Sequence, residues 1–247
     1  MRIENSFIAA RGVGAATERK LWQQGVTHWD DFEDGLLGPK TTENVWEFID
    51  NARPRLDDGD AAYFGDALPS KEFWRAYENF AQDACFFDIE TTGLDSARNK
   101  VTTVSVHRDG DTRTYVQGDN LTTGALREEF DESSLLVSFN GKRFDQPFLE
   151  DCFDLDVTTP HLDLLYLCKQ VGLSGGLKNI EQEVGIGREE EGVDGREAVR
   201  LWHQYERGDD AALDRLVKYN REDTQNLQTL LDHVHGTLRA ETLEPHL

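Results

Sequence analysis

Two acidic residues stand close together in the segment FFDIETTGL, at Asp88 and Glu90. Side chains alternate between the two faces of a β-strand, so a strand here places both acids on one face together with Phe86. Phe87 and Ile89 then occupy the other face. Burying unpaired carboxylates is costly. The pair therefore indicates either a strand that opens into a cleft where a cation neutralises the acids, or a strand end that simply reaches solvent.

A second polar group interrupts the apolar pattern of a late helix. Leucines and valines recur at helical spacing over residues 209–235, but Asn220, Asp223 and Thr224 fall where that spacing predicts buried residues. Tyr219 lies one turn before Asp223 on the same side. The pattern indicates a polar site inside the protein. The alternative is a break between two helices near Tyr219, whose polar residues cap the helix ends.

A third candidate follows the apolar run LLVSF at 135–139. Such a run is typical of a strand buried on both faces, and α/β sheets bind ligands at the carboxyl ends of their strands. Asn140 lies at that end. Phe144 and Phe148 provide the apolar face of a following helix, which leaves Asp145 beside them. A single aspartate there would usually be a surface residue. Asp145 is therefore a candidate site residue only in combination with the other acids.

The elements that must position these residues form two regions. Glycine turns divide residues 6–52 into short amphipathic stretches, which predicts a small all-helical unit over 1–52. The composition of 53–61 predicts a linker, and an aromatic stripe at helical spacing follows it, so 53–80 is predicted as a linker and packing helix. From residue 84 the pattern predicts strands, with RDGD as a hairpin turn and later helices, and hence an α/β domain over 81–247.

The charge of the chain constrains its partners. The sequence has 48 acidic and 26 basic residues, a formal charge of -22, which argues against an ordinary basic nucleic-acid binder at low salt. The acidic excess is spread evenly and accompanies 38% hydrophobic residues, so it predicts a solvated surface around a folded core. At a salt concentration near 1 M the Debye length falls to ~3 Å, and the net charge would then scarcely repel a phosphate chain.

Several classes of protein are disfavoured. No apolar run approaches the ~18 residues of a membrane span, and the start MRIENSF does not resemble a signal peptide, so we expect a cytoplasmic protein without a membrane partner. Cys85, Cys152 and Cys168 stand singly in apolar surroundings and are predicted as core residues, not as disulfide or zinc ligands. The sequence also contains no GxxxxGK[ST] phosphate loop.

Taken together, these residues resemble the three exonuclease motifs of the DEDD superfamily. The first motif would contain Asp88 and Glu90, the second Asp145, and the third Tyr219 and Asp223, with the tyrosine marking the DEDDy branch. The segments HLDLL, LKNIE and YNREDTQNL are similar to those of the YprB-like predicted exonucleases, and the resemblance covers residues 63–235. It implies an α/β fold with a ribonuclease H-like mixed sheet flanked by helices.

The resemblance also implies a mechanism. Asp88, Glu90, Asp145 and Asp223 would hold two divalent ions, Mg²⁺ or Mn²⁺, which suit oxygen ligands and can activate water and stabilise a leaving oxygen. Tyr219 would position the attacking water by hydrogen bonding. The protein would be a metal-dependent 3′–5′ exonuclease, with DNA somewhat favoured over RNA. The residues implied around the terminal nucleotide are Asn140 and Phe144, and those implied to support the metal ligands are Asn220 and Asp163, the latter being equally well explained as a helix cap.

Residues 6–32 resemble a helix-hairpin-helix element whose hairpin contains Gly12 and Gly14. Backbone N–H groups at such a turn can bind a phosphate without reading bases, and Arg11, Arg19 and Lys20 flank it. A purely structural hairpin is the alternative. The acidic composition, with more Arg than Lys, resembles that of haloarchaeal proteins.

Two other functions are compatible with the same fold. A catalytically silent nucleic-acid-binding module would be expected to lose one or more of the acids, whereas this sequence has all four and the tyrosine, which favours activity. A structure-specific endonuclease could use the same carboxylates, and no sequence feature excludes it. The oligomeric state and the choice between single and double strands stay open.

Overall fold

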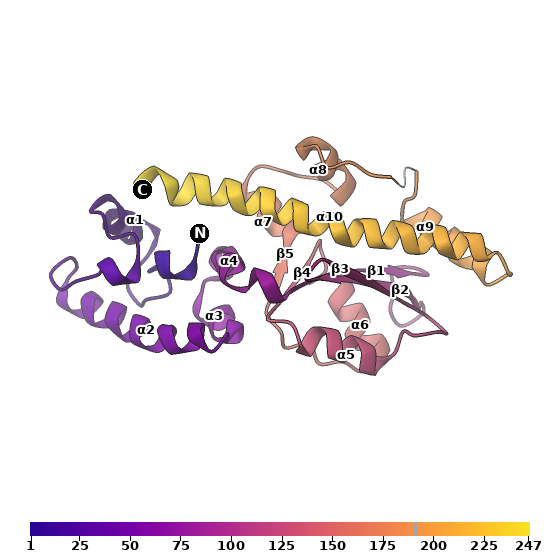
Figure 1. The fold of residues 1–247 in the computed structure, drawn as a ribbon, viewed down its shortest axis with the longest axis horizontal. Coiled ribbons are helices and arrows are strands. Elements are labelled where there is room, and N and C mark those ends of the chain that lie inside the picture. The colour runs from indigo at the N-terminus through magenta and orange to yellow at the C-terminus, as the bar shows by residue number, and fades with distance from the viewer. Residues whose placement is uncertain (190–191) are drawn as a thin grey trace. The chain divides into compact units, whose positions relative to one another are not determined.

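The structure, a computed structural model, describes residues 1–189 and 192–247 and divides the chain into two units. The first unit comprises Met1–Ala81 and Val234–Leu247, and the second comprises Gln82–His233. The elements drawn in Figure 1 are α1 (Ala15–Gln23), α2 (Pro39–Asp57), α3 (Ala61–Ala67), α4 (Tyr77–Phe80), β1 (Ala84–Thr91), β2 (Val101–Arg108), β3 (Asp111–Val116), α5 (Thr123–Asp131), β4 (Leu135–Ser138), α6 (Asp145–Phe153), β5 (His161–Asp163), α7 (Leu164–Gln170), α8 (Leu177–Val184), α9 (Gly195–Tyr205) and α10 (Asp210–Thr242).

The second unit is built on a mixed sheet whose described strands have the order β3-β2-β1-β4-β5. Strand β1 pairs antiparallel with β2 and parallel with β4, and β4 pairs parallel with β5. The hairpin between β2 and β3 turns through Asp109 and Gly110, which both have positive φ, at 50° and 75°. Two such residues are what a type I′ hairpin requires. Every residue of β4 is buried, so the doubly covered strand predicted from LLVSF is confirmed.

Helices cover both faces of this sheet. Cys85, Phe87 and Ile89 of β1 belong to an apolar core that also contains Leu126 of α5 and Phe148 of α6. Figure 1 shows α5 and α6 on one face of the sheet and α10 on the other. The acids of β1, which alternate with these apolar residues, therefore belong to the face covered by α10. The predicted fold class, a mixed α/β sheet flanked by helices, is confirmed.

Helix α10 is continuous from Asp210 to Thr242. The alternative of a break near Tyr219 is therefore wrong. Asn220 and Thr224 are fully buried, and the Thr224 hydroxyl donates a hydrogen bond of 2.8 Å to the backbone carbonyl of Asn220 one turn earlier. The polar gap in the apolar stripe is thus an internal polar site within an unbroken helix.

The first unit differs from the sequence prediction at the expected linker. Residues 53–57 continue helix α2 through Pro54, and α3 begins at Ala61. The composition of this segment predicts a linker, but its arginines form ion pairs. Arg53 lies 2.5 Å from Asp30, and Arg55 lies 3.0 Å from Asp60. Only a short turn therefore separates the two helices.

A buried ion pair joins α1 to the aromatic segment at 70–80. Arg75 and Glu18 are only 2% and 1% exposed, and their side chains lie 2.8 Å apart. Glu18 also accepts hydrogen bonds from the Ser6 hydroxyl at 2.9 Å and from the Phe7 N–H at 2.8 Å. A buried pair is tolerated when its remaining hydrogen-bonding capacity is satisfied in this way. The aromatic segment is thus part of the core of the helical unit.

Two smaller expectations have different outcomes. Cys85 and Cys168 are buried as predicted, but Cys152 is exposed because it lies on the solvent side of α6, so the core prediction is wrong for that residue. No helix in the two described stretches combines the length and the apolar character needed to cross a bilayer.

Candidate metal and catalytic site

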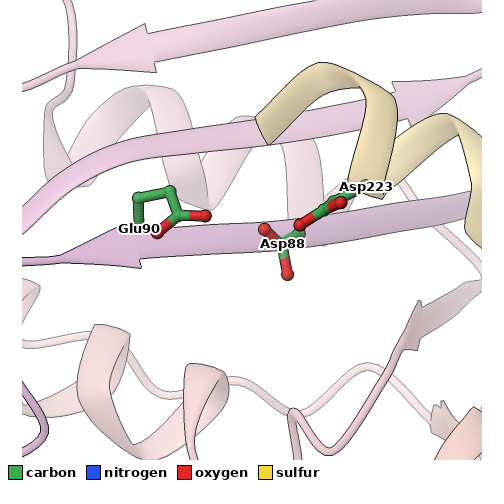
Figure 2. A group of neighbouring side chains, drawn as sticks. All are labelled: Asp88, Glu90 and Asp223. Carbon is green, nitrogen blue, oxygen red and sulfur yellow. The ribbon is translucent and has the colours of Figure 1, made fainter. Parts of the chain in front are cut away.

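Three carboxylates converge between β1 and α10. Asp88 and Glu90 come from the strand and Asp223 from the helix, as Figure 2 shows. One oxygen from each lies within 4.8 Å of the others. Glu90 and Asp223 are 9% and 5% exposed, and Asp88 is partly buried. The period of the strand and the period of the helix thus bring together acids that are far apart in the sequence.

The surroundings of these acids oppose their ionisation. Burial raises the pKa of Asp88 and of Glu90 well above the usual range, and the charge of Asp223 raises both further. Burial also raises the pKa of Asp223, although nearby cations partly offset the effect. Carboxylates placed this way are stabilised in their charged form by a cation, and oxygen donors suit a hard divalent ion such as Mg²⁺ or Mn²⁺. The three residues therefore fit a divalent metal.

Asp145 lies directly beside this group. It is the first residue of α6 and is 5% exposed, and its Oδ1 accepts a hydrogen bond of 3.2 Å from the backbone N–H of Ile89, between the two acids of β1. Burial raises the pKa of Asp145 to about 7. Its charge contributes to the raised pKa of Asp88 and of Glu90. The structure therefore places all four predicted acids in one neighbourhood, with three of them in closest contact.

Asp163 fixes the turn that leads into α6. One carboxylate oxygen accepts a hydrogen bond of 2.8 Å from the backbone N–H of Asn140, and the other accepts one of 3.2 Å from Lys142. Asp163 also caps α7, because it accepts a hydrogen bond of 3.0 Å from the N–H of Leu165. The helix-cap interpretation is therefore confirmed, and the same carboxylate also supports the turn before Asp145.

Gly141 permits that turn to be tight. A Cβ at this position would lie 2.1 Å from the Ser138 hydroxyl and 3.4 Å from the Cβ of Asp145. Ser138 cannot easily move away, because its hydroxyl lies 2.7 Å from Nε2 of the buried His161. A side chain at residue 141 would therefore displace the segment that carries Asp145.

Tyr219 lies in contact with the acids. It is 6% exposed, and its hydroxyl is hydrogen bonded to the Asp223 carboxylate. Burial raises the pKa of Tyr219, and the charges of Asp223 and Glu90 raise it further. The phenol therefore stays protonated and can donate or orient a hydrogen bond, but it is a poor base.

Asn220 holds Asp88 in place. Its Nδ2 donates hydrogen bonds to Asp88 Oδ2 at 2.7 Å and to the Asp88 backbone carbonyl at 3.2 Å. The predicted supporting position of Asn220 behind a metal ligand agrees with this geometry. A hydrogen bond to the carboxylate also lowers the pKa of Asp88, although burial outweighs it.

Three charged residues near the acids are missing from the sequence prediction. Arg188 forms ion pairs with both Glu181 and Asp223. Lys178 lies with its Nζ 4.4 Å from the ring centre of Tyr219 and lowers the pKa of Glu90 and of Asp223. Lys178 and Glu181 both belong to LKNIE, where the spacing of three residues places them on one side of a helix. Arg188 follows α8 outside regular secondary structure, so no periodic signal indicates it.

Two cavities border the acid group. One of about 540 Å³ is lined by Glu90, Leu94 and Phe144, and one of about 290 Å³ is lined by Lys178, Tyr219 and Asp223. Both share the residues at the start of α9, Asp194 and Gly195. The structure thus places Phe144 in the wall of a cavity next to an acid of the site. Asn140 lines neither of these two cavities, and its backbone N–H instead bonds to Asp163.

Comparison with known proteins identifies the class of the second unit. Residues 85–235 match the RNase H superfamily, so the chain belongs to that superfamily. A family B DNA polymerase from the hyperthermophilic archaeon Pyrobaculum calidifontis is similar in structure, with a TM-score of 0.53 and 17% identity over 66% of this chain. The match covers only 26% of the polymerase. Brucella melitensis NrnC with bound Mg²⁺ has a TM-score of 0.50 and 20% identity, over 68% of this chain and 80% of that one. These likenesses show the fold, and no curated protein matches.

Proposed function

We propose that this protein is a metal-dependent nuclease that hydrolyses phosphodiester bonds of nucleic acid as a 3′–5′ exonuclease of the DEDDy branch. The convergence of Asp88, Glu90 and Asp223 within 4.8 Å carries the proposal. Membership of the RNase H superfamily supports it, and so does Mg²⁺ bound to the structurally similar NrnC. We propose Mg²⁺ or Mn²⁺ as the cofactor, with two ions held by these three residues and Asp145.

Each residue of the site has a separate role in the proposed hydrolysis. Bound divalent ions would activate water and stabilise the leaving oxygen of an in-line displacement. Asp88, Glu90, Asp145 and Asp223 supply oxygen ligands, and Asn220 keeps Asp88 oriented. The protonated Tyr219 hydroxyl positions a water molecule by hydrogen bonding.

The cavity beside Glu90 is compatible with an exonuclease, which must hold the terminal nucleotide of its substrate next to the metal ligands. Its walls include Phe144 and the 86% exposed Leu94, both of which can contact a nucleobase. Its volume, about 540 Å³, falls within the range of cavities that hold small ligands. We propose that the terminal nucleotide of the substrate, DNA in preference to RNA, occupies this cavity.

Activity of acid variants tests the proposal. Asp88→Asn and Asp223→Asn remove a metal ligand with little change in size, and we expect a loss of turnover of roughly 100-fold or more. Asp119→Asn is a matched control, because Asp119 is exposed in the same unit. The assay uses DNA and RNA, single and double stranded, each with a 5′ label, in high salt with Mg²⁺ or Mn²⁺.

The products distinguish the alternatives. Stepwise shortening from the 3′ end supports the exonuclease, and cleavage of circular substrates would show an endonuclease. Turnover near the wild-type rate in either acid variant would contradict the site assignment. Complete inactivity of the wild type on every substrate, with binding retained, would favour the silent module.

We also propose that the first unit contributes to nucleic-acid binding. Gly12 has φ of 90°, and Gly14, the residue before α1, provides no side-chain cap, so the first N–H groups of that helix have no side-chain partner among the described residues. Arg11, Arg19 and Lys20 are exposed nearby in sequence. A phosphate at this turn would provide affinity without base recognition.

A further inference from the structure

The acids of the site differ in the group that compensates each of them. Asp88 receives a hydrogen bond from the neutral Asn220, and Asp145 receives one from a backbone N–H. Asp223 is instead paired with a full positive charge, the guanidinium of Arg188. The ion pair uses Oδ1 of Asp223, an oxygen that a metal ion at this cluster could also bind.

Arg188 is held from two sides. Its Nε donates to Oε2 of the fully buried Glu181, and its Nη1 donates to Oδ1 of Asp223. The Arg188 side chain is 11% exposed. Within the described residues, its Nη2 and Oε1 of Glu181 are buried without a hydrogen-bond partner. Glu181 therefore anchors the guanidinium beside Asp223 whether or not the bond to Asp223 is made.

We propose that Arg188 is a positioning residue that acts as an internal counter-ion of Asp223 and thereby weakens the binding of divalent metal to the acid cluster. The inference rests on the proposed function in taking this cluster as the metal site. A metal ion that binds Oδ1 of Asp223 competes with the guanidinium for that oxygen. Glu181 retains the displaced side chain nearby, so Arg188 can pair with Asp223 again when the metal leaves.

The expected effect follows from the contact that must be broken. A hydrogen bond between charged groups contributes enough that its loss changes an equilibrium roughly tenfold to a hundredfold. Metal binding to the wild type should be weaker by that factor than binding to a variant without the guanidinium. A purely structural role of Arg188 predicts the opposite, because loosening Asp223 would weaken metal binding.

Direct metal titration of the full chain tests this inference. Mn²⁺ binding is measured by calorimetry or electron paramagnetic resonance in high salt, without nucleic acid, so that turnover plays no part. We expect Arg188→Gln to bind Mn²⁺ roughly tenfold to a hundredfold more tightly than the wild type. Arg188→Lys keeps the charge but loses the planar fork that joins two carboxylates, so it should bind with intermediate affinity.

Lys178→Gln is the matched control for charge. Lys178 also lowers the pKa of Glu90 and of Asp223, but its ammonium forms no ion pair in the described part of the chain. Removing it should tighten Mn²⁺ binding much less than removing Arg188. An equal gain in Mn²⁺ affinity in both Gln variants would mean that loss of any nearby positive charge has the same effect. That result would overturn the inference.

Two further outcomes separate this inference from the proposed function. Equal or weaker Mn²⁺ binding in Arg188→Gln, or in Arg188→Lys if the first variant does not fold, overturns the role of Arg188 and leaves the metal site intact. Absence of Mn²⁺ binding in the wild type and in every folded variant refutes the metal site itself.

Discussion

We expect Asp145→Asn to stabilise the protein at pH 8 when divalent metal is removed with EDTA. Asp145 is 5% exposed, and burial raises its pKa from 3.8 to about 7. Because the folded-state pKa lies above that of the unfolded chain, ionisation of this carboxyl opposes folding. The penalty is absent below pH 3.8, grows as the pH rises toward 7 and is constant above that value.

The size of the effect follows from the shift. A displacement of about 3 pH units corresponds to ~4 kcal/mol of unfolding free energy at pH 8. Asparagine does not ionise and can still accept the hydrogen bond from Ile89, but its buried amide N–H groups need partners and cost about 1–3 kcal/mol. We therefore expect a net gain of about 1–3 kcal/mol at pH 8 and a net loss of similar size near pH 4, where the wild-type carboxyl is mostly neutral.

Denaturant unfolding in EDTA and high salt, at pH 4 and at pH 8, measures both values. Asp119→Asn is again the control, because an exposed carboxylate should show little difference between the two conditions. A stability difference for Asp145→Asn that is the same at both pH values would refute the reasoning. With Mn²⁺ in excess at pH 8 the order should reverse, because the metal stabilises the wild type through the ligand that the variant lacks.

Two other substitutions test the remaining roles. Tyr219→Phe should lower turnover about tenfold or more while Mn²⁺ affinity stays close to that of the wild type, because only a positioning hydroxyl is removed; a parallel loss of metal affinity would show that Tyr219 instead supports Asp223. Replacing Arg11, Arg19 and Lys20 together by Gln should reduce the slope of log affinity against log salt by up to about 2 on single strands, measured with Ca²⁺ to prevent cleavage. An unchanged slope would indicate a purely structural hairpin.

The faces of the site acids could be predicted from the sequence because each acid lies in a regular element. The period of two in β1 separates Asp88 and Glu90 from the apolar core, and the period of 3.6 in α10 turns Asp223 toward the same space. Asp145 follows a strand whose continuous apolar run fixes its place inside the sheet. Local periodicity therefore predicted the faces of Asp88, Glu90 and Asp223, whereas the gathering of all four acids at one site was implied by the resemblance to the DEDD motifs.

Residues outside regular elements could not be predicted in this way. Arg188 lies outside regular secondary structure, so no sequence period indicates which way its side chain points. Its pairing with Glu181 and Asp223 depends on the path of the loop after α8. The same limit applies to the buried pair of Glu18 and Arg75, because either residue alone resembles an ordinary surface charge. Composition was also misleading at residues 53–57, where a charged, proline-containing segment continues a helix and its arginines form ion pairs.

The site also shows how the fold tolerates acids in its interior. Burial disfavours the charge of every one of them, and the protein supplies at least one partial compensation for each, such as Asn220 for Asp88, the Ile89 N–H for Asp145, Arg188 for Asp223 and the neighbouring Lys178 for Glu90. None of these groups carries the double charge of a divalent ion, and burial still raises the pKa of each of these acids. A divalent ion bound there, as proposed, would favour the charged forms, and its binding free energy would add to the stability of the second unit. The features that make this region unfavourable as a core are therefore the ones that make it favourable as a metal site.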